Sequence, residues 1–260
     1  MSGTTRASAL AMEWQKLRPW RFASRTMAIA IGLAVTVSAL VAVAMASNAR
    51  HMTLADRQSF DAVGMSMQGV NAAVLAIAAF GVLCVTREYA SGMISITFLA
   101  QPKRLRVLGA KMVTHASVAA VGGTLACAAA LAAGQAMLGT GGLSGGITAD
   151  RIAPALAGGV AYLVLLCLWG IGLGAVLRSS ASAITWMASL LVVAPVIVQI
   201  LPGSVVHLVE RWLPAQIGTA AMSAHRDPHL FAPWAGLGVL AGYVAITLVA
   251  GAWRLVTTDA

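Results

Sequence analysis

The residues best suited to chemistry gather in one short polar stretch, residues 87–93, which reads REYASGM. Its arginine, glutamate and tyrosine can form an ion pair, exchange a proton or bind a charged partner. The stretch lies between two long apolar runs, 65–86 and 112–138. A connection between two helices commonly needs only a few residues. We therefore expect the polar stretch to have a role of its own.

The sequence lacks the usual nucleotide-binding and catalytic patterns. The phosphate-binding loop needs a Gly-Lys dipeptide, and the chain contains none. The sequence GLGVLA at 236–241 fits a loose dinucleotide pattern, but it lies inside an apolar run with no preceding strand. Nucleophilic catalysis needs a base within hydrogen-bond reach, and no acidic residue lies within an apolar run. We predict no enzyme active site and no bound cofactor in this chain.

Metal ligation and disulfides are also not indicated. The three cysteines, Cys84, Cys127 and Cys167, all fall in apolar runs and form no C-x-x-C pair, so we expect buried, reduced thiols. His225 and His229 are four residues apart, but a proline between them disfavours a regular helix. We therefore predict no metal site.

Composition places most of the chain in lipid. Of its 260 residues, 59% are hydrophobic and only 10% are charged, whereas soluble domains carry about 25% charged residues. Long uncharged runs in a bilayer must be helices, because helices satisfy their own backbone hydrogen bonds. We predict a single all-α membrane domain over 1–260. Its six predicted transmembrane helices are 26–46, 65–86, 112–138, 152–177, 182–201 and 233–256.

The net charge of +9 is distributed unevenly over the two sides of this arrangement. The side with both termini and the 87–111 loop carries twelve basic and three acidic residues, and the other side carries five of each. Basic residues favour the cytoplasmic side, so both termini and the 87–111 loop are predicted to be cytoplasmic. The basic excess then contacts lipid headgroups rather than nucleic acid. The first apolar run is too long for a cleaved signal peptide.

Segments outside the spans have patterns of their own. In residues 1–25, Leu10, Trp14 and Leu17 share one helical face, which predicts an amphipathic helix at the membrane interface; a disordered basic tail is the alternative. Between the fifth and sixth spans we expect partly buried or re-entrant extracytoplasmic segments. There, residues 207–212 suit a short amphipathic helix that Pro214 would stop.

Several uncharged residues within the spans are candidates for contacts. Two small-xxx-small pairs, Gly170 with Gly174 and Gly238 with Gly242, favour close helix packing, either within the subunit or between subunits. Five larger polar or aromatic residues could line a pathway for an amphipathic molecule, or could serve as interhelical hydrogen bonds and interface anchors. They are Asn71, Gln135, Trp169, Trp186 and Gln199.

The 87–111 loop has the pattern of a short cytoplasmic helix. Tyr89, Met93 and Ile96 are spaced on one helical face, with Gly92 between them. Pro102 can then open a new helix. The apolar face must be buried either on the membrane surface or in a groove of a soluble partner.

The chain resembles the ABC type-2 transporter permease family. The loop REYASGMISITFLAQPKRLRVLGAKM resembles the signature loop of that family, in which Glu-Tyr-x-x-Gly-Thr precedes a proline-basic pair and a lysine that opens the third span. The corresponding residues here are Glu88, Tyr89, Gly92, Pro102, Arg104 and Lys111, with Met93 in place of the usual threonine. EWQKLR (13–18), GIGLGAVLRSSASAI (170–184) and LPAQIG (213–218) resemble further family segments in the same order.

The resemblance implies an exporter subunit in a bacterial plasma membrane. Two permease subunits, expected to be two copies of this chain, would bind two cytoplasmic ATPase subunits that hold ATP and magnesium. The loop after the second span would be the coupling helix that docks on the ATPase. The residues implied in that contact are Arg87, Glu88, Tyr89, Gly92, Met93 and Ile96, together with Glu13 and Arg18 of the N-terminal helix.

Two other functions remain open from the sequence. The chain could be a membrane-embedded sensor or anchor whose ATPase partner signals without moving cargo. It could also be a membrane enzyme, which would need a reactive polar cluster. For an exporter, the family carries drugs, lipids, peptides and other amphipathic molecules, and the sequence does not select among them.

Overall fold

Helices account for all regular structure in the part of the chain that the computed structural model describes, residues 21–90, 104–144, 148–225 and 227–257. Six helical segments are long and apolar enough to cross a membrane. They are Phe22–His51, Val70–Ala90, Leu105–Thr140, Ala149–Leu177, Ser180–Val198 and Pro233–Thr257. The prediction of an all-α membrane protein with six spans is therefore confirmed. The predicted N-terminal amphipathic helix and Gly92, Met93 and Ile96 lie outside the described residues.

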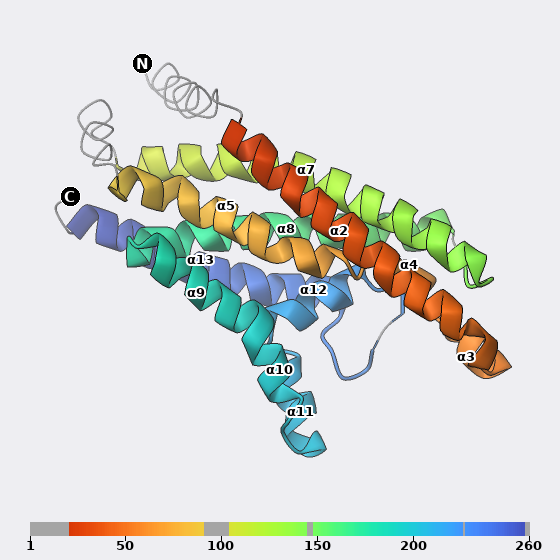
Figure 1. The fold of residues 1–260 in the computed structure, drawn as a ribbon. Coiled ribbons are helices and arrows are strands. Elements are labelled where there is room, and N and C mark those ends of the chain that lie inside the picture. Colours follow the sequence, from red (N-terminus) through yellow and green to blue (C-terminus); the bar gives the residue numbers. More distant parts are fainter. Residues whose placement is uncertain (1–20, 91–103, 145–147, 226, 258–260) are drawn as a thin grey trace.

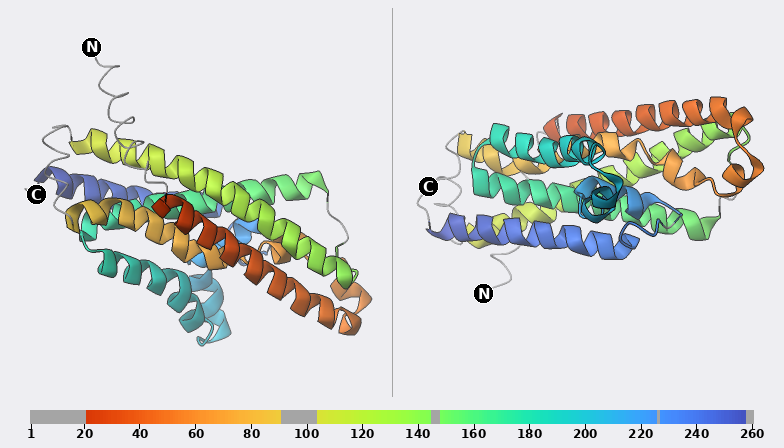
Figure 2. Two further views of the ribbon diagram at one scale, coloured as in Figure 1. Left: turned by 45° about the horizontal axis from the view of Figure 1, so that its top comes forward. Right: turned by 90° about the horizontal axis from the view of Figure 1, so that it is seen from below.

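The long helices lie side by side in one elongated bundle, from which the fifth span leans away (Figures 1 and 2). The elements in chain order are α2 (Arg21–Asn48), a 3-10 turn (Ala49–His51), α3 (Leu54–Gln58), α4 (Ala62–Ser66), α5 (Val70–Ala90), α7 (Arg104–Thr140), α8 (Ala149–Leu177), α9 (Ser180–Ala188), a π-helical turn (Ser189–Val193), α10 (Ala194–Val198), α11 (Gly203–Glu210), α12 (Pro214–Met222) and α13 (Pro233–Thr257).

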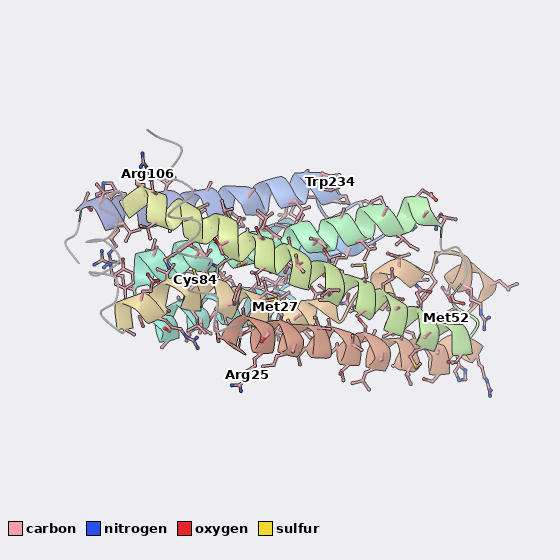
Figure 3. The ribbon with its side chains drawn as sticks, turned by 90° about the horizontal axis from the view of Figure 1, so that it is seen from above. Arg25, Met27, Met52, Cys84, Arg106 and Trp234 are labelled. Carbon is pink, nitrogen blue, oxygen red and sulfur yellow. The ribbon has the colours of Figure 1, made fainter. Side chains whose placement is uncertain are left out.

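The two ends of the bundle differ in charge. At one end α2 begins, α5 ends, α7 begins and α13 ends, next to the turn between α8 and α9 (Figure 1). We call this the basic end, since it holds Arg87, Arg106, Lys111, Arg178 and Arg254. Arg106 lies there in Figure 3, whereas Met52 lies at the far end of the bundle. The far end, here the mixed end, carries arginines and acidic residues together.

Two differences between the helix bounds and the sequence prediction concern the region around α5. The predicted 65–86 span is divided, because α4 ends at Ser66 and α5 begins at Val70. Gly69 in the intervening turn packs directly on α2: its N–H donates to Ser38 Oγ at 3.0 Å, and a Cβ would lie 2.1 Å from the Ala34 carbonyl oxygen. The predicted 87–111 loop is shorter, because α5 continues to Ala90 and α7 begins at Arg104.

The fifth span is irregular in the middle. Its π-helical turn, Ser189–Val193, ends two residues before Pro195. Proline has no N–H to donate to the preceding turn, and π-turns and prolines are the usual causes of helix bends. α9, α10 and α11 together diverge from the other helices (Figure 1).

Glycines bring the backbones of α5 and α8 close together. A Cβ on Gly81 would lie 2.1 Å from the Cys167 carbonyl oxygen, and one on Gly170 would lie 2.5 Å from the Ala78 carbonyl oxygen. Gly174 also faces α5, with a Cβ position 3.0 Å from the Val82 carbonyl oxygen. The first predicted glycine pair therefore packs within the chain, and α8 becomes the most buried of the six spans.

Two short helices occupy the region between the fifth and sixth spans. Pro214 was predicted to stop a short helix over 207–212, but α11 already ends at Glu210 and Pro214 is the first residue of α12. Proline suits a first helical turn because its missing N–H would have no helical partner there. α12 packs against α8 and α13 with Ile217, Ala221 and Met222 buried, whereas α11 is largely exposed.

Candidate functional site

The described polar residues of the 87–111 region converge at the basic end. α5 carries Thr86 to Tyr89 in its last turns, and α7 carries Lys111 and His115 in its first turns. Helical spacing turns Arg87 outward, where it is exposed, and Glu88 inward, where it is buried. Two neighbouring charged residues thus face different surroundings.

Glu88 and Lys111 form an ion pair. Lys111 Nζ lies 2.7 Å from Glu88 Oε1, and the two residues are 4% and 7% exposed. A charge is costly to bury unless an opposite charge and hydrogen bonds accompany it. The pair joins the last turn of α5 to the early turns of α7, on either side of residues 91–103 in the sequence.

Arg87 and His115 extend this cluster on two sides. The Arg87 guanidinium lies 3.6 Å from the centre of the Phe22 ring of α2, a cation–π contact. His115 Nδ1 lies 3.0 Å from the Lys111 carbonyl oxygen, and its ring packs 5.1 Å from the Phe80 ring. His115 is therefore a hydrogen-bonded residue of the helix bundle.

The turn between α8 and α9 completes the basic end. Ser180 Oγ donates to Thr86 Oγ1 at 2.7 Å, which connects α9 to α5. Arg178 ends α8 in the left-handed conformation, and its guanidinium lies 5.1 Å from the centre of the Tyr89 ring. Its side chain also donates to the Arg254 carbonyl oxygen, while Arg254 donates to Val176 O. The end of α5 thus contacts α2, α7, α9 and the turn between α8 and α9, and α13 is bonded to that turn.

The predicted pathway residues have different surroundings. Asn71 Nδ2 donates to Thr219 Oγ1 of α12 at 3.4 Å, and Gln135 Nε2 donates to Ala62 O and to Ser66 Oγ at 2.9 Å. Both are interhelical hydrogen bonds. Trp169 is buried 6.1 Å from the Tyr243 ring. Trp186, which is 49% exposed, and Gln199 lie on the outer surface of the fifth span. The contacts of Asn71, Gln135 and Trp169 thus involve different partner residues.

A second polar cluster, at the mixed end, has no counterpart in the sequence prediction. Asp61 caps α4 by accepting from Gly64 N at 2.9 Å, and it also accepts from Ser223 Oγ at 2.5 Å. The backbone N–H groups of Ala224 and His225 donate to the same carboxylate at 3.0 and 3.2 Å. A pocket of about 220 Å³ lies beside it, lined by residues of α12 and of the segment before α13, Thr219, Ser223, His225, Asp227 and Phe231 among them. Asp61 before a short helix could have been recognised as a cap, but not its distant partners.

Metal-ligating residues do not assemble within the described ranges. No group of three or more histidine, cysteine or acidic residues there could hold a metal ion. His229 instead stacks on His207 with ring centres 4.2 Å apart. The three cysteines are free thiols, with Cys127 and Cys167 fully buried.

Neither a scan against protein-family models nor a search of curated proteins finds a match for this chain. The class of protein is defined by the fold itself. Six apolar helices in one all-helical bundle make this chain a multi-pass membrane protein.

Proposed function

We propose that this chain is the membrane-spanning permease subunit of an ATP-binding-cassette exporter. Two copies would bind two cytoplasmic ATPase subunits, which hold ATP and magnesium, and would move an amphipathic molecule such as a drug, lipid or peptide out of a bacterial cell. The resemblance of residues 87–111 to the coupling loop of ABC type-2 permeases suggests this function.

The observation that carries the proposal is the cluster of non-covalent contacts that joins the helices at the basic end. A permease driven by another protein must transmit displacement from the docking segment to its membrane helices. Residues 91–103 lie between α5 and α7 in the sequence, and these helices are joined by the buried Glu88–Lys111 pair. Such a firm attachment suits a force-transmitting segment better than a passive connector.

Charge supports the orientation. Among the described residues, the basic end carries most of the lysine and arginine, and the positive-inside tendency would place it in the cytoplasm with both termini. Exposed Arg87 would then face the cytoplasm, and the contacts predicted for Glu13, Arg18, Gly92, Met93 and Ile96 would lie on the same side. ATP shifts a conformational equilibrium only if it favours one state, so the docking contact must differ between states.

The test is reconstitution with the ATPase encoded by a neighbouring reading frame. We expect the two proteins to co-purify, and the ATPase to hydrolyse ATP faster with this chain in lipid vesicles than alone. Arg87→Glu should weaken the association, because it reverses an exposed charge at the basic end. Arg50→Glu is the matched control at the mixed end, where it should change neither association nor hydrolysis.

The outcomes separate the candidate functions. ATP-dependent movement of a fluorescent lipid analogue or a cationic dye across the vesicle membrane supports an exporter. Stimulated hydrolysis without movement of either probe favours a sensor or anchor subunit. Failure of the unmodified chain to bind any ATPase partner would overturn the proposal.

A further inference from the structure

α5 and α7 are consecutive in the chain but have little direct contact along most of their lengths. α5 packs mainly against α8 and α2, and α7 packs mainly against α2 and α8. α2 and α8 thus mediate most of the packing between them. Unlike an ordinary helical hairpin, this arrangement does not hold its two consecutive helices together by a continuous apolar seam.

Direct contacts between the two helices include specific ones near the basic end. Lys111 Nζ meets Glu88 Oε1 at 2.7 Å, and farther along the bundle the His115 ring lies 5.1 Å from the Phe80 ring. The ion pair is the contact nearer to Ala90 and Arg104, where the two helices end and begin. It is therefore placed to set how far apart those helix ends lie.

The apolar surroundings strengthen the attraction between the two charges of this pair. Buried apolar residues of α5, α7, α8 and α13 form a cluster at the same end: Val85, Leu108, Ile171, Ala175 and Leu255, with Tyr89 and Met112 packed against it. Charges attract each other more strongly in such a low-dielectric environment than in water. Separating the two charges would give up this attraction inside the bundle, so the pair resists separation more than an exposed ion pair would.

α5 packs closely on α8. Gly81 and Gly170 bring the two backbones so close that a Cβ at either position would overlap the opposite helix. Interfaces packed this tightly change position together, because close-packed side chains and backbones have few alternative arrangements. A displacement applied to α5 should therefore be passed on to α8.

We infer that Glu88 and Lys111 are positioning residues, whose ion pair fixes the separation of α5 and α7 at the basic end and so couples α7 to the closely packed α5–α8 pair. The consequence for transport rests on the proposed function: a load on the segment between these helices would move them together instead of parting them. Glu88 then acts from inside the bundle, while Arg87 lies on the surface.

The experiment measures this separation in the isolated full-length chain in lipid nanodiscs. Spin labels at Ala90→Cys and Val113→Cys report on exposed positions of α5 and α7, in a chain with Cys84→Ala to remove the half-buried thiol. We expect one narrow distance distribution without further change. Glu88→Gln and Lys111→Gln should each lose it and give a broad distribution.

A charge exchange distinguishes positioning from general destabilisation. The double variant Glu88→Lys, Lys111→Glu restores an ion pair with the charges reversed, and we expect it to recover the narrow distance even if the single variants fold poorly. Thr86→Val is the matched control, since it removes a polar link at the same end that joins α5 to α9. It should leave the distance between α5 and α7 unchanged.

Unchanged distances in both single variants would overturn the inference, and so would a charge exchange that restores neither the distance nor the yield. Because no ATPase is present, this outcome is separate from that of the co-purification test. A chain that binds no ATPase but loses the narrow distance in the single variants would retain the positioning role and lose the proposed function.

Discussion

Two glycine pairs of identical spacing have opposite surroundings in this protein. Gly170 and Gly174 of α8 face the backbone of α5, where an added Cβ would lie 2.5 and 3.0 Å from carbonyl oxygens. Gly238 and Gly242 of α13 are exposed, and an added Cβ would meet nothing within 4 Å. The same motif is thus a tight internal contact in one helix and an open surface in another.

The difference shows what small-xxx-small spacing can and cannot indicate. In a bilayer, lipid tails are as apolar as leucine, so burial of apolar surface does not choose which face of a helix packs inward. The α13 glycines share their outward face with Trp234, Ile246 and Trp253, all largely exposed. This face meets lipid or another protein, whereas the α8 glycines are committed to α5.

The largest expected effect is at the internal pair. Gly170→Val should destabilise the bundle by roughly 3 kcal/mol, because overpacking a closely packed interface costs about 1–3 kcal/mol or more. Thermal unfolding in detergent measures the loss. Gly238→Val is the matched control on α13, and a loss as large there would contradict the contrast between the two pairs.

Single methyl groups sharpen the contrast, because the two pairs should respond with opposite signs. Gly174→Ala should cost about 1 kcal/mol, since its Cβ would press on the Val82 carbonyl oxygen within a packed interface. Gly242→Ala should stabilise α13 by up to about 1 kcal/mol, because alanine favours a helix over glycine and nothing obstructs its Cβ. Comparison of the two midpoints of unfolding is the measurement, and equal shifts would refute the expectation.

A polar contact at the basic end should have a similar or smaller effect. Thr86→Val removes the 2.7 Å hydrogen bond with Ser180 at the α5–α9 contact and keeps nearly the same side-chain shape. We expect a loss of about 1 kcal/mol, the usual net value of one hydrogen bond. Thr124→Val on α7 is the control, because Thr124 is exposed and bonds only within its own helix. A greater loss in the control would count against a bonding role for Thr86.

The smallest effect concerns the exposed cap of α3. Hydrogen bonds from Thr53, first from its side chain and then from its backbone N–H, lower the pKa of Asp56 from 3.8. Because the folded pKa lies below the unfolded one, the stabilisation is present above pH 3.8 and is lost as pH falls through the lower, folded pKa. Amide exchange in α3 should therefore rise in that acidic range. Asp56→Asn should remove this pH dependence and leave the exchange rates of α8 unchanged.

Hydropathy and charge determined much of the protein. Six apolar runs were sufficient to predict six helices, because backbone groups in lipid must bond within their own segment. The uneven distribution of lysine and arginine likewise distinguished two ends of the bundle, and the structure gathers Arg87, Arg106 and Arg178 at one of them. These properties depend on residue type and order along the chain, so they can be read without a fold.

Tertiary structure decided which residues meet. Glu88 and Arg87 are neighbours in sequence, yet one is buried on Lys111 and the other is exposed on Phe22. Asn71 and Gln135 proved to bond α12 and α4, partners far away in the chain. Tertiary structure also placed one glycine pair against α5 and left the other exposed on α13. Helix packing in lipid depends on backbone approach and on matched polar groups, which residue order alone does not specify.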